Sequence, residues 1–166
     1  MLVYRSNGTG YQYSWGTSNI GQGSGAIAWR TGDVNNDGRT DIIQLWNNNG
    51  RLGIIVYRSN GSGYYYSWGT SNIGQGSGAL AWLTQDVDGD GRTDIVQTWN
   101  NGGRLAINVY RSNGAGYELW LRNPDTGQGA GALAWLPGDV DNDGEGDLIH
   151  PWNNSGQLGL NTYSTQ

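Results

Sequence analysis

Short runs of apolar residues, each bounded by polar turns, make up most of this chain. In the middle of the sequence such runs fall at residues 78–82, 94–99, 105–110 and 117–121. The first alternates small and large side chains, the others are β-rich, and no window shows helical periodicity. The intervening stretches are rich in Gly, Asn and Ser, which is typical of turns. The pattern predicts an all-β chain in which four short antiparallel strands follow one another.

This four-strand pattern recurs at a fixed spacing along the chain. Val3-Tyr4-Arg5-Ser6-Asn7-Gly8 returns at Val56 and again at Val109, 53 residues further each time. A constant period indicates a repeat architecture. We therefore expect one repeat domain, residues 1–166, built from units 3–55, 56–108 and 109–161, with residues 160–166 duplicating residues 1–7. Four short antiparallel strands in a unit of about 50 residues correspond to one blade of a β-propeller.

The charge of the chain is concentrated in three places. Of the 14 acidic residues, 12 lie in three loops, one in each unit, whereas the basic residues are nine dispersed arginines. Nucleic-acid binding is not expected, because it requires a basic patch. No apolar run approaches the length of a membrane span, and no membrane association is expected. The absence of cysteine excludes disulfides. The N-terminus lacks the pattern of a signal peptide, and we expect a segment of a secreted, extracellular parent protein.

Each acidic loop places oxygen-bearing side chains on alternate residues of a tight turn. Positions 1, 5 and 9 are Asp, position 3 is Asp or Asn, and position 6 is Gly, as in Asp86-Val-Asp88-Gly-Asp90-Gly91-Arg-Thr-Asp94. Calcium takes about six to eight oxygen ligands, and the first half of the loop follows the EF-hand pattern. So many carboxylates would repel one another unless a cation neutralised them. The alternative is a solvated turn in which Asp and Asn bond their own backbone.

These residues resemble the FG-GAP or VCBS repeat of integrin alpha-chain propellers and of many secreted bacterial and fungal proteins. The resemblance rests on three DxDxDG-type loops at constant spacing between β-rich runs. In that family the loop joins the first and second strands of each blade and binds calcium, which implies about one Ca²⁺ per repeat here. Position 7 would contribute only its backbone oxygen. The metal site residues implied are Asp33, Asn35, Asp37, Arg39, Asp41, Asp86, Asp88, Asp90, Arg92, Asp94, Asp139, Asp141, Asp143, Glu145 and Asp147.

The opposite face of such a blade collects a different set of side chains. The turn between the second and third strands and the connection between blades lie there, away from the acidic loops. Their indoles, amides and guanidinium groups suit a sugar, whose apolar face stacks on Trp while its hydroxyls bond polar groups. The alternative is that these turns merely need Asn and Gly. The predicted ligand-binding residues are Trp46, Asn48, Arg51, Trp68, Asn72, Gln75, Trp99, Arg104 and Trp152.

Two functions are compatible with these features. The first is a calcium-stabilised β-propeller binding module for carbohydrate, similar to a lectin. The alternative is a purely structural or engineered symmetric scaffold with no ligand beyond calcium. An enzyme is not expected, because the only histidine is His150 and the carboxylates already belong to the loops.

Three blades are too few for a ring, since propellers have about four to eight. An open arc would expose unpaired strand edges. Two copies related by a twofold axis would give six blades, so we expect a homodimer. The alternative is a β-trefoil, because Gln44-Leu-Trp46 and Gln97-Thr-Trp99 resemble the QxW motif of ricin-type lectins, although His150-Pro-Trp152 breaks it.

Overall fold

The computed structural model describes residues 1–128 and 131–164. Within these residues the chain forms thirteen strands and no helix, so no helix there could span a membrane. The prediction of an all-β fold is confirmed. The strands are β1 (Leu2–Ser6), β2 (Tyr11–Gly16), β3 (Ala26–Gly32), β4 (Asp41–Asn48), β5 (Arg51–Ser59), β6 (Tyr64–Gln75), β7 (Ala79–Gln85), β8 (Asp94–Asn101), β9 (Arg104–Ser112), β10 (Tyr117–Gln128), β11 (Leu136–Gly138), β12 (Asp147–Asn154) and β13 (Gln157–Tyr163).

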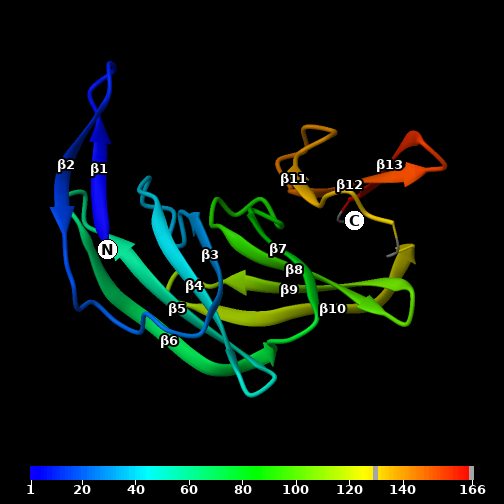
Figure 1. Cartoon of the computed structure of the whole chain (residues 1–166), viewed down its shortest axis with the longest axis horizontal. Helices are drawn as coiled ribbons and strands as arrows, with labels where there is room; N and C mark the ends of the chain where they lie inside the picture. The colour runs from blue at the N-terminus through cyan, green and yellow to red at the C-terminus, as the bar shows by residue number, and fades with distance from the viewer. Residues whose placement is uncertain (129–130, 165–166) are drawn as a thin grey trace.

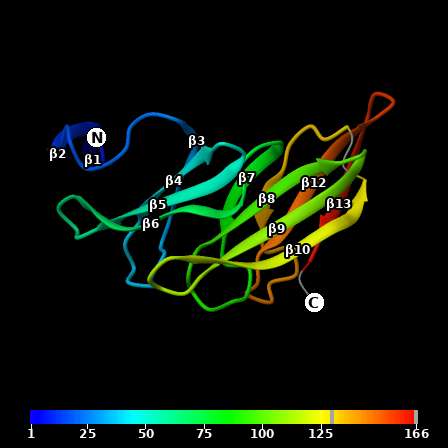
Figure 2. The ribbon, with the colours of Figure 1, turned by 90° about the horizontal axis from the view of Figure 1, so that it is seen from below.

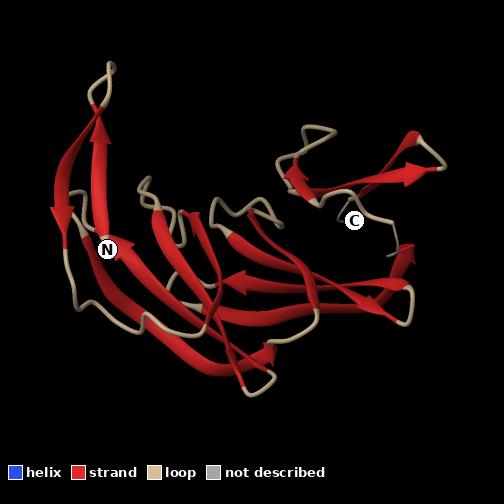
Figure 3. Cartoon of the chain, viewed as in Figure 1, coloured by secondary structure: helices blue, strands red, loops and turns tan. Residues whose placement is uncertain are grey.

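The strands are grouped into four antiparallel sheets that follow one another in chain order. We name them the N-terminal hairpin (β1–β2), the first sheet (β3–β4–β5–β6), the second sheet (β7–β8–β9–β10) and the C-terminal sheet (β11–β12–β13). In each sheet every strand pairs with its neighbour in sequence. The sheets are set around an open arc, with the N-terminal hairpin at one end and the C-terminal sheet at the other (Figure 1, Figure 3). Figure 2 shows the same succession from below.

The sheets share one register, as the repeat predicts. Ile42 faces Tyr57 in the first sheet, Ile95 faces Tyr110 in the second, and Leu148 faces Tyr163 in the C-terminal sheet. The N-terminal hairpin also keeps the register of the first sheet: Tyr4 faces Tyr13 as Tyr57 faces Tyr66. The two-stranded and three-stranded sheets at the ends of the chain therefore keep the register of the four-stranded sheets.

The apolar core lies between successive sheets. In β5 and in β9 six consecutive residues are buried, so both faces of these strands are covered. One cluster packs Trp82, Ile95, Tyr110 and Tyr117 of the second sheet on six apolar residues of the first, namely Val34, Ile43, Leu45, Leu52, Ile54 and Val56. A second cluster packs Trp135 and Leu148 of the C-terminal sheet on five residues of the second, namely Val87, Val96, Leu105, Ile107 and Val109. Trp82 and Trp135, which the repeat places at equivalent positions, thus both pack between sheets.

Two details differ from the sequence-based expectation. Residues 68–75 were expected in the connection between blades, but they belong to β6, which pairs with β5 as far as Gln75 across two bulges. The first strand of the third unit is also shorter than expected, because around Ala132 only an isolated bridge to Trp152 precedes β11. Pro137 lies in β11 and has no N–H to donate to a ladder.

The β-trefoil finds no support in the described residues. That fold would bring hairpins of all three units into one common barrel. The described strands instead form separate sheets with consecutive antiparallel order.

His150 stands where the other two units have Gln44 and Gln97. It is fully buried, stacks on Trp135 with ring centroids 4.1 Å apart, and its Nδ1 lies 3.5 Å from the Asn161 amide. Burial lowers the pKa of His150. The stability that this neutral ring supports is present above the usual histidine pKa and is lost as the pH falls through it toward the lower folded-state value.

We expect His150→Gln to reduce the pH sensitivity of folding on the acid side. Between about pH 7.5 and about pH 5.5 the melting temperature should fall further in the parent than in the variant. Only in the parent does unfolding expose a neutral imidazole that then takes up a proton. Thermal denaturation followed by circular dichroism measures both. Equal losses in the two proteins would contradict this account.

Candidate functional site

The three acidic loops all join the first and second strands of their sheets. Asp86 follows β7 directly and Asp94 opens β8, and the same holds for Asp33 and Asp41 around β3 and β4. In the C-terminal sheet, positions 1 and 9 are Asp139 and Asp147, around β11 and β12. Because antiparallel pairing fixes the two strand ends, the first and last acidic positions of each loop are held close together.

Each loop turns through two residues in the left-handed conformation. Position 6 is glycine as expected, with φ of 82° at Gly91. Position 4 is also left-handed, with φ of 57° at Asn36, 71° at Gly89 and 61° at Asn142. Sequence reasoning missed this second position, although Asn and Gly are the residues that tolerate it.

Two carboxylates hold the backbone of the loop. In the second loop, Asp86 accepts hydrogen bonds from the N–H groups of Asp90 and Gly91 at 3.1 and 2.7 Å. Asp94 accepts from Val87 and Ser112 at 3.1 and 2.7 Å. The first loop repeats this pattern with distances of 2.7 to 3.1 Å. The alternative in which these acids bond the backbone of their own turn is therefore correct for these two loops, but it does not account for every oxygen of the loops.

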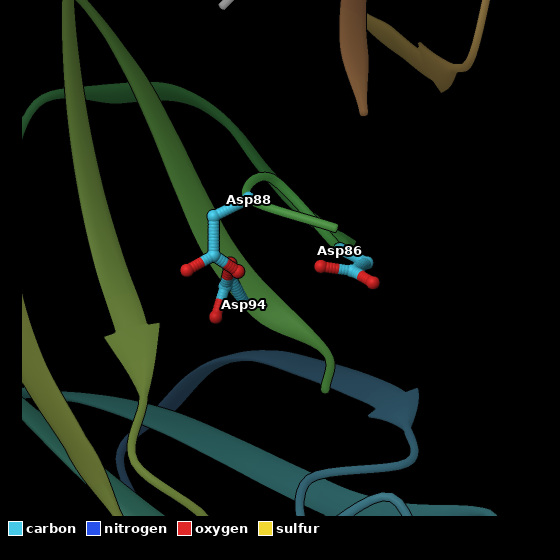
Figure 4. A group of neighbouring side chains, drawn as sticks. All are labelled: Asp86, Asp88 and Asp94. Carbon is cyan, nitrogen blue, oxygen red and sulfur yellow. The ribbon is translucent and has the colours of Figure 1, made fainter. Parts of the chain in front are cut away.

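The same carboxylates also converge on one point. Asp86, Asp88 and Asp94 each offer an oxygen within 4.8 Å of the others, and Figure 4 shows the three side chains gathered where β8 begins. Asp139, Asp141 and Asp147 form an equivalent triad in the third loop. In the first loop Asn35 occupies the middle position. Two acidic triads could thus hold a metal ion, since a carboxylate oxygen that accepts one hydrogen bond keeps a second lone pair.

Oxygen atoms at position 3 fit a cation in two loops. Asn35 Oδ1 and Asp88 Oδ1 are buried and have no hydrogen-bond partner among the described residues. A buried oxygen without a partner is costly. Both atoms belong to the position whose side chain the loop pattern assigns to the ion, so the donor set fits a hard cation such as calcium.

The electrostatics of the second loop point the same way. The pKa of Asp94 is raised to about 6, chiefly by burial and also by the charges of Asp88 and Asp90, while two backbone hydrogen bonds act in the opposite direction. Burial likewise raises the pKa of Asp41. A divalent cation at the centre of the loop would favour the charged form of these carboxylates.

Arginine side chains neutralise part of this charge. Arg39 pairs with Asp37 at 2.8 Å, and Arg92 pairs with Asp90. Position 7 was expected to act through its backbone oxygen alone, and the structure adds this side-chain role in two loops. Arg111, from the third strand of the second sheet, pairs with Asp88 at 2.6 Å.

The third loop differs from the other two in exposure and charge. Asp139, Asp141 and Asp143 are exposed, whereas their counterparts in the second loop are half-buried. Position 7 is Glu145 instead of arginine. The difference in exposure arises because the C-terminal sheet covers the second loop, where Gly146 donates its N–H to Asp86 O at 2.7 Å. No described residue covers the third loop in the same way.

The predicted ligand-binding residues fall into two groups. Arg51, Asn72 and Gln75 meet in a cavity of about 680 Å³ between the first and second sheets, which Leu119 and Arg122 also line. Arg51 donates to Asn72 Oδ1 at 2.7 Å, and nearby Asn48 donates to Ser71 O at 3.1 Å. In the second sheet the counterpart Arg104 is ion-paired with Asp125.

The tryptophans do not join this cavity. Trp46 and Trp152 lie over Gly53 and Gly159 of the adjacent strand, where a Cβ atom would overlap the indole, and Trp99 faces Ala106. Trp68 packs on Tyr117 of the second sheet, with ring centroids 6.3 Å apart. These side chains are half-buried and pack within or between sheets.

Comparison with known families identifies part of the chain. Residues 86–150 match the family model of the FG-GAP-like repeat. This segment is similar to FG-GAP-like repeats. The match begins at the first ligand position of the second loop and includes the whole third loop. No significant match to the chain was found among curated proteins or solved structures.

The left-handed position 4 of the FG-GAP-like loop can be tested at Gly89. Gly89→Asn should change stability little, because Asn36 and Asn142 adopt the same conformation. Gly89→Val should lower the free energy of unfolding by about 1–2 kcal/mol more, since a β-branched residue tolerates positive φ poorly. A Cβ atom there meets nothing closer than Gly144 O at 3.6 Å, so the difference reports backbone strain. Urea denaturation at matched calcium measures it, and equal stabilities would contradict the assignment.

Proposed function

We propose that this chain is a calcium-stabilised segment of a β-propeller that acts as an extracellular carbohydrate-binding module. The observation that carries the proposal is the convergence of Asp86, Asp88 and Asp94 around a buried oxygen without a partner, within a segment that matches the FG-GAP-like repeat. Calcium is favoured over magnesium because flexible loops rich in carboxylate and carbonyl oxygens suit its larger coordination number.

The propeller architecture is supported by the form of the sheets. The first and second sheets are four-stranded antiparallel meanders, one following the other around an arc. Consecutive four-stranded sheets of this kind are the blades of propellers. FG-GAP-like repeats typically occur in extracellular proteins, which supports the proposed location.

The carbohydrate proposal rests on the cavity between the first and second sheets. Two guanidinium groups, from Arg51 and Arg122, and the amides of Asn72 and Gln75 surround a space that Leu119 borders with apolar surface. Convergent planar donors beside an apolar wall suit a ring with hydroxyls on its rim. The cavity lies at the opposite end of the strands from the acidic loops, so a sugar there need not touch calcium. Nothing in this proposal requires catalysis.

Calcium should stabilise the folded chain. A hundredfold excess over the dissociation constant contributes about 2.7 kcal/mol per site, because only the folded loops bring the ligands together. Excess EDTA should therefore lower the melting temperature of calcium-loaded protein sharply. Asp86→Ala should remove one ion from the stoichiometry measured by calorimetry, whereas Asp125→Asn, outside the loops, should not. A melting curve unaffected by EDTA would exclude a structural calcium and favour arginine as the sole neutralising charge.

Sugar binding should depend on the first-sheet arginine. On a glycan array with calcium present, Arg51→Ala should reduce the signal by about tenfold or more, because one bidentate donor contributes about 1.5–3 kcal/mol. The matched control is Arg104→Ala, since that guanidinium is already held by Asp125. Retained binding in Arg51→Ala would place the ligand elsewhere. No binding to any glycan by the parent would favour a purely structural scaffold.

A further inference from the structure

The contacts between neighbouring sheets are repeated within the chain and so define a template. Thr93 donates its N–H to Asp33 O at 2.8 Å between the first and second sheets, and 53 residues later Gly146 donates to Asp86 O at 2.7 Å. Arg5 reaches Gly61 O from the N-terminal hairpin as Arg58 reaches Gly114 O from the first sheet. The apolar clusters repeat in the same way, with Trp82 and Trp135 in equivalent places.

At the C-terminal end of the arc, the residues equivalent to those that pack on a following sheet are exposed to solvent. Val34 and Val87 are 0 % and 2 % exposed because the next sheet covers them, whereas their counterpart Val140 is 57 % exposed. Leu52 and Leu105 are fully buried, and their counterpart Leu158 is 67 % exposed. This end of the molecule therefore presents the surface that, elsewhere in the chain, supports a following sheet.

At the N-terminal end the complementary half of the template is bare. Trp29 is 46 % exposed, against 6 % for Trp82 and 8 % for Trp135. It borders a cavity of about 640 Å³ together with Ile42 and Tyr57. These three residues are the counterparts of Trp82, Ile95 and Tyr110, which in the second sheet pack on the valine and leucine of the preceding sheet. The cavity is thus bordered by counterparts of the residues that pack on Val34 and Leu52 within the chain, which suits Val140 and Leu158.

The strand inventory is complementary as well. The C-terminal sheet consists of a first, second and third strand, and the N-terminal hairpin of a third and fourth. Together they make one four-stranded sheet with the third strand present twice. Residues 160–166, of which 165–166 lie outside the described residues, duplicate residues 1–7, so only one of the two copies can occupy that place.

The two copies of the third strand are not equivalent in sequence. Residues 3–7 keep the Val-Tyr-Arg-Ser-Asn of the complete sheets, whereas the C-terminal copy has Ser164 in place of the arginine. In the second sheet that arginine, Arg111, pairs with Asp88 of the acidic loop. In the C-terminal sheet the equivalent acid, Asp141, can meet the equivalent arginine only if Arg5 of another copy brings it.

We propose that a second copy of this chain docks head to tail, its N-terminal hairpin completing the C-terminal sheet and its Trp29 cavity receiving Val140 and Leu158. The partner's β1 takes the place of residues 160–166, and the partner's Arg5 pairs with Asp141. A twofold arrangement forms this junction twice and closes a ring of six sheets, each of which then has four strands. The proposal rests on the propeller architecture but on neither calcium nor carbohydrate binding.

Light scattering coupled to size-exclusion chromatography tests the assembly with the full chain. The expected mass is twice the 17.9 kDa of one chain. A monomer, or any closed assembly other than a dimer, would overturn the proposal. The measurement is made with calcium and again with EDTA, and calcium titration is followed separately. A monomeric protein that still binds calcium would therefore overturn this inference and leave the calcium proposal intact.

Two variants test which residues form the junction between the two copies. Leu158→Asp should give a folded monomer, because residue 158 is exposed in the single chain and buried only at the junction. Tyr65→Glu is the matched control and should remain dimeric, since its counterparts Gln12 and Glu118 are polar and exposed. Circular dichroism confirms folding of both. A dimeric Leu158→Asp protein would overturn the proposed contact.

Truncation decides which copy forms the third strand. A chain ending at Gly159 should remain dimeric, because the partner's β1 replaces what is removed. A chain beginning at Gly8 should be monomeric. The opposite pair of results would overturn the assignment of β1.

Discussion

Both faces of the four-stranded sheets are apolar, and the structure depends on covering both of them. Six consecutive buried residues in β5, and again in β9, leave these strands no face for water. A helix or a second layer could serve this purpose in another protein. In the described residues this cover comes from the neighbouring sheet, so each sheet depends on its neighbours for stability. The repeat is therefore a physical requirement of the fold as well as a pattern in the sequence.

The acidic loops are part of this packing. The carbonyl group of Asp33 accepts the Thr93 N–H from the next sheet, while its carboxylate organises its own loop. Val34, one residue further, is fully buried in the core between the sheets. A cation that orders the loop thus also fixes the residues that neighbouring sheets share. This coupling gives a physical reason why a metal ion held by the loop would also stabilise the packing between sheets.

Near-identical units acquire different properties from their positions in the arc. The second and third loops have the same acidic spacing, yet one is half-buried and the other exposed, because only the second is covered by a following sheet. The side chains on the opposite face also differ between units through single substitutions. Asn72 accepts a hydrogen bond from Arg51, whereas Asp125 at the equivalent place neutralises Arg104. A ligand that requires an uncompensated guanidinium would therefore distinguish between units that the repeat makes almost equal.

The sequence by itself determined the strands, their order and the location of the acidic loops. These are local properties: apolar runs of strand length, turn residues between them, and alternate Asp residues around a glycine. The 53-residue period also gave the shared register, since equivalent residues must pair in the same way. The extent of β6 could not be predicted from the sequence. Asn72 and Gln75 are residue types typical of turns, and they belong to a strand only because β6 pairs with β5.

Only the tertiary structure decided which side chains are available. The tryptophans predicted to bind a ligand are half-buried against glycine or against the next sheet, since packing takes their apolar surface first. Likewise Val34 and Val140 occupy equivalent positions in the first and third loops, yet one is buried and the other exposed. Their difference is the presence of a neighbouring sheet, a fact that no local pattern in the sequence contains.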